Sequence, residues 1–299
     1  MTKIATEAIV LLKKGNAQES LARQAISVNL PQKNEVLIES EAFGLNYADV
    51  MARRGLYREA PPMPCVVGYE VVGKITHVGE GVNTDLIGKR VLGFCRFGGY
   101  GKHVITNDFA TVEIGDNTTI REFVTINRGT TDRWKTKVGN NCLIMAYSHV
   151  AHDCVIGDNC ILSNSVQLAG HVVLGDWVWI AGVSAVHQFV TIGQHSYIAG
   201  GSLVSKDVPP YIKAVRNPLS YGGVNSVGLK RRGFDLEKIN HILDIYRYIF
   251  NKGMNTTQAL EFIEEELPAT DERDEIVTFI RDSGRGIIKR FGKGLVEED

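Results

Sequence analysis

The sequence predicts a mainly β protein in three parts: a partial small barrel, then a parallel β-helix, then a C-terminal α-helical tail. Three observations support this fold class. Short β-rich runs separated by glycines fill roughly the first hundred residues, an aliphatic residue stands at fifteen of the sixteen positions spaced six apart from Ile114 to Val204, and apolar residues at helical spacing follow. These changes place the expected domains at residues 1–107, 108–210 and 211–299.

The composition is that of a globular protein without a strong charge bias. Of 299 residues, 44% are hydrophobic and 22% are charged, and the formal net charge is −1. We therefore expect neither nucleic-acid binding nor membrane insertion. No apolar run is long enough to span a bilayer and the N-terminus lacks the features of a signal peptide, so the expected location is cytoplasmic. Five cysteines without a C-x-x-C pair argue against a disulfide framework and a zinc ribbon.

The first part carries strand-like runs such as VLIES and VVGKITHVG. It resembles the N-terminal GroES-like domain of medium-chain quinone oxidoreductases. Gly68-Tyr69-Glu70 stands where zinc-dependent relatives carry Gly-His-Glu, which places the resemblance in the zinc-free branch. No G-x-G-x-x-G motif opens a helix, so the nucleotide-binding turn that such a reductase needs is missing, and GFCRFGGYG is predicted to be a barrel loop.

The second part follows a strict period of six. Fifteen of sixteen positions read from Ile114 are Ile, Leu or Val, and the positions four residues later are all Thr, Val, Cys or Ser. A fixed short period is typical of a parallel β-helix in which one aliphatic and one small side chain per hexad point inward, with 18 residues per coil. Cys142, Cys154 and Cys160 occupy the small inward position and are predicted to be core.

Histidines gather outside this inward register in SHVAHDCVIGDNC and in the coils that follow. With 18 residues per coil, residues 150–155, 168–173 and 186–191 are expected to stack as rungs of one flat face. His152 then lies over Gly170 and Gln188, and Asp153 lies beside His171. His149 is expected at the corner just before this face and His187 two rungs away. A zinc site is disfavoured because the nearby thiols point inward; an ordinary solvated surface is the remaining alternative.

Several motifs from residue 111 to about 293 together resemble one family, the UDP-N-acetylglucosamine acyltransferases of lipid A synthesis. These motifs are VEIGDNTTIREFVTINRGTT, SHVAHDC, LAGH, AVHQF, DVPPY and GLKRRGF. The resemblance implies a left-handed β-helix, a homotrimer with active sites between subunits, and no cofactor or metal. The implied substrates are UDP-N-acetylglucosamine and a 3-hydroxyacyl acyl-carrier protein.

The same resemblance implies roles for individual residues. His152 matches the general base that activates the sugar 3-hydroxyl, Asp153 would orient it, and the N–H of Gly170 matches the oxyanion donor. Gly200 matches the position that limits acyl length. The residues matching the substrate pocket are His149, His171, His187 and Gln188, and those matching contacts to phosphate or pantetheine are Asn225, Arg231 and Arg232.

This second resemblance is also incomplete. Members of the family usually have several more coils before VEIG, and Val227 stands where many carry an acidic residue. The GroES-like resemblance and the acyltransferase resemblance meet near NDFATVEIGDN. The sequence therefore predicts that the chain is a chimera. Two alternatives to an acyltransferase therefore stay open: a fragment of an NADPH-dependent zinc-free quinone oxidoreductase, and a non-catalytic fusion product.

The tail contains three amphipathic runs. Leu236, Ile239, Leu243, Tyr246 and Phe250 recur at helical spacing, with Asp235 and Gly253 as start and stop signals. TTQALEFIEEELP and DERDEIVTFIRD predict two further helices. The resemblance implies that this tail helps to receive the carrier protein.

Overall fold

The fold is described from a computed structural model, which covers residues 3–291. Residues 1–2 of the predicted first domain and 292–299 of the predicted third lie outside the described residues. The chain divides into two compact units. We call residues 1–112 with 128–134 the barrel unit, and residues 113–127 with 135–299 the helix unit.

The barrel unit is built from antiparallel strands in two sheets. One sheet has the order β2-β1-β4, and the other contains β8-β6-β5-β3-β7. Val36, Ile38, Val71 and Ile75 are at most 1% exposed and form its core. The elements are β1 (Lys3–Leu11), α1 (Ala17–Ser20), β2 (Leu21–Asn29), β3 (Val36–Phe43), α2 (Tyr47–Arg54), β4 (Cys65–Val66), β5 (Glu70–Val78), the 3-10 helix η1 (Thr84–Leu86), β6 (Arg90–Phe94), β7 (His103–Thr106) and β8 (Asp108–Ile114).

The glycine-rich stretch after β6 is a loop, as predicted. Residues 95–102 contain no helix, and the backbone turns so that the Gly101 N–H donates to the Gly98 carbonyl at 3.0 Å. Gly98 has φ +97°, a left-handed conformation that glycine adopts without steric cost. The segment is therefore a turn of the barrel and has no strand-turn-helix geometry for a pyrophosphate.

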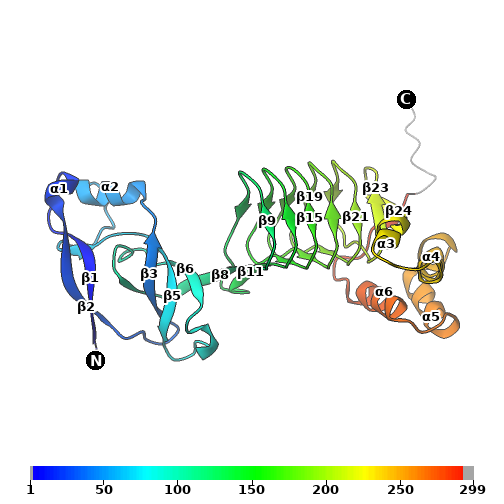
Figure 1. Cartoon of the computed structure of the whole chain (residues 1–299), viewed down its shortest axis with the longest axis horizontal. Helices are drawn as coiled ribbons and strands as arrows, with labels where there is room; N and C mark the ends of the chain where they lie inside the picture. Colours follow the sequence, from blue (N-terminus) through cyan, green and yellow to red (C-terminus); the bar gives the residue numbers. More distant parts are fainter. Residues whose placement is uncertain (1–2, 292–299) are drawn as a thin grey trace. The chain divides into compact units, whose positions relative to one another are not determined.

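The helix unit is a parallel β-helix in which three sheets of short strands run along the coil axis (Figure 1). Pairing joins His149 to Gln167 and Gln167 to Ala185, so a coil takes 18 residues, as predicted. Its strands are β9 (Thr119–Ile120), β10 (Thr125–Ile126), β11 (Lys135–Val138), β12 (Leu143–Ile144), β13 (His149–Val150), β14 (Val155–Ile156), β15 (Ile161–Leu162), β16 (Gln167–Leu168), β17 (Val173–Leu174), β18 (Trp179–Ile180), β19 (Ala185–Val186), β20 (Thr191–Ile192), β21 (Tyr197–Ile198) and β22 (Leu203–Val204).

The inward positions of the hexads form the core of the β-helix. Ile144, Leu168 and Ile180 are fully buried, as are the small residues between them such as Val166. The predicted core cysteines are 0–2% exposed: Cys142, Cys154 and Cys160. In the first coil the same register is open, because Ile114 and Ile120 are 41% and 42% exposed. Asp132, the one exception to the aliphatic period, lies in the segment 128–134 that clusters with the barrel unit.

The tail begins with a hairpin of β23 (Ile212–Val215) and β24 (Ser220–Val224) and continues into helices. These are α3 (Ser226–Arg231), α4 (Leu236–Asn251), α5 (Thr256–Glu266) and α6 (Asp271–Asp282), before the short β25 (Lys289–Arg290). The Asp235 side chain caps α4, as predicted, by accepting from the Lys238 N–H. Within residues 3–291, no helix is long and apolar enough to cross a bilayer.

One of the five tail residues at helical spacing lies outside the core. Leu236 is 67% exposed because it is the first residue of α4, beyond the turns that pack on the β-helix. The helix buries Ile239, Ile242, Ile245 and Tyr246 instead. The Tyr246 hydroxyl donates to the Pro210 carbonyl at 2.6 Å, which satisfies its only polar group in the core.

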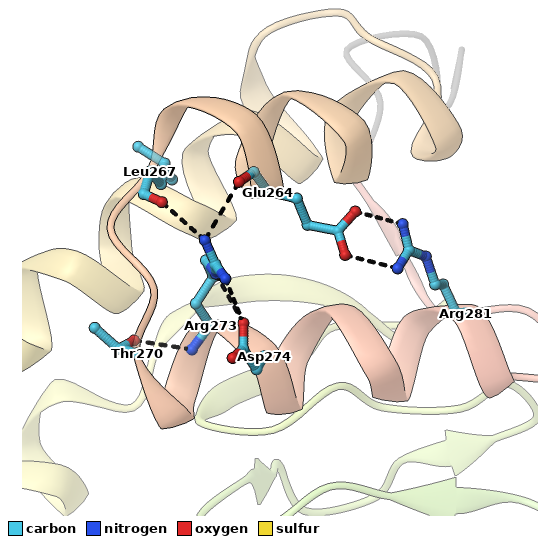
Figure 2. A network of polar contacts seen from close by, with 6 residues as sticks. All are labelled: Glu264, Leu267, Thr270, Arg273, Asp274 and Arg281. Carbon is cyan, nitrogen blue, oxygen red and sulfur yellow. Dashed lines mark hydrogen bonds and ion pairs between the residues drawn. The ribbon is translucent and has the colours of Figure 1, made fainter.

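Two arginines of α6 fasten it to α5 (Figure 2). The Arg281 guanidinium pairs with both carboxylate oxygens of Glu264, with Nη1 2.6 Å from Oε1. Arg273 donates to the Leu267 carbonyl at 2.9 Å, where α5 has just ended. A guanidinium that reaches the last carbonyls of a helix satisfies acceptors left without intrahelical partners.

Candidate functional site

His152 and Asp153 lie in a corner of the β-helix, between β13 and β14. The prediction of one flat face over residues 150–155 was wrong. The strands are only two residues long, and Asp153 turns the chain with φ +61°, so His149 belongs to a strand and His152 to the turn. The predicted stacking between coils was nevertheless correct, since the His171 N–H donates to the His152 carbonyl at 3.0 Å.

The Asp153 side chain is fully buried and holds the His152 ring. Its Oδ2 lies 2.8 Å from His152 Nδ1 and 3.5 Å from His171 Nε2. The backbone N–H of Asp153 donates to Thr136 Oγ1 at 2.9 Å, which fixes the corner itself. Because an ionised carboxylate only accepts, the hydrogen of a neutral His152 ring sits on Nδ1. The lone pair of Nε2 is then available on a side chain that is 38% exposed.

Glycine at position 170, one coil further on, leaves room for the His152 ring. A Cβ placed on Gly170 would lie 2.6 Å from His152 Cε1 and 2.8 Å from Nε2, well inside van der Waals contact. The backbone of Gly170 therefore approaches the basic nitrogen closely. Within residues 3–291, its N–H donates to no acceptor, which leaves this donor available beside the imidazole.

The other predicted pocket residues divide into two groups. His171 joins the His152 corner: it is 8% exposed, lies edge-on to His152 at 5.3 Å and stacks on Phe189 at 4.7 Å. His149 projects from β13 and exchanges a hydrogen bond with Thr125 Oγ1 at 2.7 Å. Three others carry no such link to Asp153. They are His187, whose Nδ1 donates to the adjacent carbonyl at 3.0 Å, Gln188, and Gly200, which lies at a different corner between β21 and β22.

Asn225, Arg231 and Arg232 line a pocket of about 290 Å³ that also includes Trp179 and Lys213. Asn225 caps the N-terminus of α3, its Oδ1 accepting from the Gly228 N–H at 3.3 Å, and Arg232 closes the C-terminal end of the same helix. Several guanidinium and ammonium groups around one small hollow suit a phosphate group.

His195, which the sequence analysis did not select, lies between β20 and β21 beside this pocket. It is 8% exposed, and its Nδ1 accepts from Arg232 Nη1 at 3.3 Å. Burial is the larger of two causes that lower the pKa of His195 to about 4, and the positive charge of Arg232 is the other. An aromatic residue 18 positions earlier, Trp177, stacks parallel to it, and this repeat of large rings at one corner was the available signal.

A metal site in the motif SHVAHDCVIGDNC would lack a thiolate ligand. Cys154 is fully buried and its Sγ donates to the Ala169 carbonyl at 3.1 Å. Among the residues that the structure describes, only His152, Asp153 and His171 present three such ligand atoms within 4.8 Å of one another. Two imidazoles and one carboxylate could accept a divalent ion, but the Asp153 carboxylate already contacts both rings, at 2.8 and 3.5 Å, in an arrangement suited to proton transfer.

Three family models match separate parts of the chain. Residues 207–288 match domain 2 of UDP N-acetylglucosamine O-acyltransferase, residues 135–170 match the bacterial transferase hexapeptide repeat, and residues 32–131 match the alcohol dehydrogenase GroES-like domain. The GroES-like match agrees with the resemblance of the first part and is consistent with a chain that combines parts of two families.

Several proteins similar to this chain are described as UDP-N-acetylglucosamine acyltransferases. The acyl-(acyl-carrier-protein):UDP-N-acetylglucosamine O-acyltransferase of Sulfurihydrogenibium is 53% identical over 201 residues, covering 67% of this chain and 74% of that protein. The Aquifex aeolicus protein of the same description is 61% identical over 180 residues, covering 60% and 69%. The UDP-N-acetylglucosamine acyltransferase structure from Bacteroides fragilis superposes with a TM-score of 0.59 at 50% identity, covering 60% and 71%.

Proposed function

Because the chain belongs to the UDP-N-acetylglucosamine O-acyltransferase family, we propose that its His152 corner transfers a 3-hydroxyacyl group from acyl-carrier protein to the sugar 3-hydroxyl. The observation that carries this proposal is the hydrogen bond from His152 Nδ1 to the buried Asp153 carboxylate. In a neutral imidazole this bond uses the hydrogen on Nδ1 and leaves Nε2 as the exposed basic nitrogen. That group suits proton abstraction from a hydroxyl near neutral pH.

The proposed reaction proceeds by direct attack. As the sugar 3-hydroxyl adds to the thioester carbonyl, His152 Nε2 takes its proton and the carbonyl oxygen becomes an oxyanion. The Gly170 N–H, which has no acceptor within residues 3–291, donates to that oxyanion. The intermediate then collapses, the carbon–sulfur bond breaks, and the proton on His152 passes to the departing thiolate. No covalent enzyme intermediate is needed.

Asp153 stabilises the charged step. Its carboxylate is fully buried, and a short contact in a poorly solvated corner strengthens its attraction for the imidazolium that forms on His152. The second contact of the same oxygen, with His171 Nε2, restricts the carboxylate to one orientation. The acid residue thus sets both the position of the His152 ring and the tautomer in which Nε2 accepts a proton.

The remaining predicted residues complete the proposed substrate pocket. We assign His149, His171, His187 and Gln188 to the sugar and acyl groups, and Asn225, Arg231 and Arg232 to phosphate or pantetheine. We assign Gly200 to the position where side-chain size limits acyl length. A Cβ there would lie 3.3 Å from the Gly182 carbonyl oxygen, a tight contact, so glycine leaves the most room for a long acyl chain.

The two halves of this proposed pocket lie at different corners of one chain. His152 sits between β13 and β14, whereas the Arg232 pocket lies near the corner between β20 and β21, and these two corners join different pairs of sheets. A second copy of the chain would bring a phosphate-binding corner beside a catalytic corner. This arrangement supports a homotrimer with its active sites between subunits, which mass photometry of the purified chain would test.

The deciding experiment measures acyl transfer from 3-hydroxyacyl acyl-carrier protein to UDP-N-acetylglucosamine. We expect transfer by the full chain and a loss of roughly 10³-fold in His152→Ala, in the range for removal of a general base. His77→Ala is the matched control, because His77 is an exposed histidine of the barrel unit. Undetectable transfer by a folded, trimeric full chain would contradict the proposal and favour a non-catalytic fusion product.

For the barrel unit we propose descent from a zinc-free quinone oxidoreductase without its activity. Tyr69 occupies the position where zinc-dependent relatives carry histidine. Desolvation by burial raises the pKa of its hydroxyl, which disfavours the phenolate that would bind a metal. The unit's elements are antiparallel strands and short helices, with no strand-turn-helix site for a dinucleotide between residues 3 and 112. Fluorescence titration with NADPH should show no binding, and saturable binding would restore the reductase alternative.

A further inference from the structure

We infer that His195 is a positioning residue, which holds the Arg232 guanidinium toward the phosphate groups of the nucleotide sugar. The inference rests on the proposed function, because it assigns a task to the phosphate-binding pocket. It concerns a residue that does not line that pocket itself: the lining includes Asn225, Arg231 and Arg232 but not His195.

His195 contacts two of the pocket residues in two different ways. Its backbone carbonyl accepts from the Asn225 side-chain amide at 2.9 Å, and its ring Nδ1 accepts from Arg232 Nη1 at 3.3 Å. Asn225 and Arg232 stand at the two ends of α3. One residue of the β-helix therefore fixes both ends of the helix that borders the pocket.

The ring that accepts from Arg232 is itself held rigidly. It lies between Trp177 and Tyr211, with ring centroids 6.2 and 5.6 Å away and planes within 6° and 14° of parallel, and Phe234 meets it edge-on at 5.1 Å. The Arg232 guanidinium also lies over the Trp177 ring at 5.0 Å. A long flexible side chain thus has two fixed attachments, and its other N–H donors remain for a ligand.

A neutral acceptor suits this task better than an acid would. A carboxylate beside Arg232 would form an ion pair and compete with phosphate for the guanidinium, whereas an uncharged imidazole restricts the side chain and leaves its full positive charge. Burial and the adjacent cation keep the pKa of His195 near 4, so the ring is neutral under physiological conditions. His195 therefore orients the charge without reducing it.

Two substitutions separate the acceptor from the ring stack. His195→Phe keeps an aromatic ring but removes Nδ1, and His195→Asn restores an acceptor close to the position of Nδ1. Both fit the backbone, because His195 has φ +59°, Phe189 adopts φ +67° in the same β-helix, and asparagine tolerates this region well. Neither change removes the backbone carbonyl that holds Asn225, so each isolates the effect on Arg232.

The expected result is a split in the kinetic constants. His195→Phe should raise KM for UDP-N-acetylglucosamine on the order of tenfold, the loss expected when a charged group loses one hydrogen bond. We expect kcat to stay within about twofold, and His195→Asn to recover most of the affinity. His77→Phe serves as the control substitution. An unchanged KM in His195→Phe, or equal impairment in both variants, would overturn the inference.

Crystal structures of the two variants distinguish this inference from the proposed function. If the unmodified chain transferred no acyl group, the proposed function would fail, and the position of Arg232 would still decide the inference. Displacement of its guanidinium in His195→Phe but not in His195→Asn supports the positioning role. A guanidinium that keeps its place over Trp177 in both variants contradicts it.

Discussion

His152 and His195 lie at two corners of the same β-helix, and their surroundings differ in every respect that matters for proton chemistry. The His152 side chain is 38% exposed and donates to a buried carboxylate at 2.8 Å. His195 is 8% exposed and accepts from a guanidinium at 3.3 Å. A carboxylate stabilises an imidazolium, whereas burial beside a cation destabilises it.

The comparison shows that the hexapeptide repeat provides the same backbone at both corners. The group that contacts the imidazole, a carboxylate or a guanidinium, decides whether the ring can take up a proton. Asp153 and His195 both adopt left-handed conformations, with φ +61° and +59°. In the first corner Asp153 takes the left-handed conformation, and the side chain of the preceding His152 reaches the surface. In the second the histidine itself takes that conformation and packs between aromatic rings.

The largest expected effect comes from removing the charge that defines the first corner. Asp153→Asn should lower kcat roughly 10³-fold, because an amide can donate to Nδ1 and so place the ring hydrogen on Nε2. Asparagine is compatible with φ +61°, so the fold should survive. Asp158→Asn, at a different corner, is the matched control. Steady-state kinetics check the result, and equal rates for both variants would refute the role of the carboxylate.

The second prediction concerns acid stability at the other corner. The His195 pKa is about 4 in the folded chain against an ordinary value of 6.5, so between these values the unfolded chain binds more protons. His195 therefore makes the free energy of unfolding depend on pH. About 3 kcal/mol of that free energy, from the difference between the two pKa values, is present above pH 6.5 and is lost as the pH falls toward 4. Urea unfolding at pH 7 and 4.5 should show a smaller acid loss in His195→Phe than in the unmodified chain. Equal losses would contradict a depressed pKa.

The third prediction alters the backbone beside His152. In Gly170→Ala the new Cβ would overlap the imidazole, which must rotate away, and kcat should fall roughly 10²-fold, as expected for a small misplacement of a reacting group. Gly182→Ala, at the equivalent position of another corner, would meet its nearest atom at 3.1 Å and is the control. Thermal melts should be similar for both variants. A fully active Gly170→Ala would mean that the ring does not work from this position.

The smallest effect should come from the aromatic support of Arg232. Trp177→Phe weakens the cation–π contact, which is worth about 0.5–1 kcal/mol at an exposed site, so KM for the nucleotide sugar should rise only a few-fold. Trp134→Phe is the control, since Trp134 has the same φ of +60° and a similar exposure of 40%. A larger rise than in His195→Phe would show that the ring stack, and not the imidazole acceptor, positions Arg232.

Most of the β-helix was predictable, because its period of six acts at every coil. The repeat of Ile144, Leu168 and Ile180 predicted both the coil length and the core, and it also placed His152 over Gly170. The flat face predicted through His152 was wrong because strand length depends on where the chain turns, and that is set by the conformation of Asp153. Sequence period alone does not report this dihedral angle.

The sequence was sufficient to predict the coil period, the inward cysteines, three of the four tail helices and the histidine that lies nearest the proposed chemistry. Each of these follows from local spacing or from a motif. The folded chain was needed to show that His152 Nδ1 faces the Asp153 carboxylate and that His195 contacts Arg232. His195 and Arg232 are 37 positions apart and meet because the tail folds back against a corner of the β-helix. Contacts between distant segments depend on packing geometry, which no local pattern encodes.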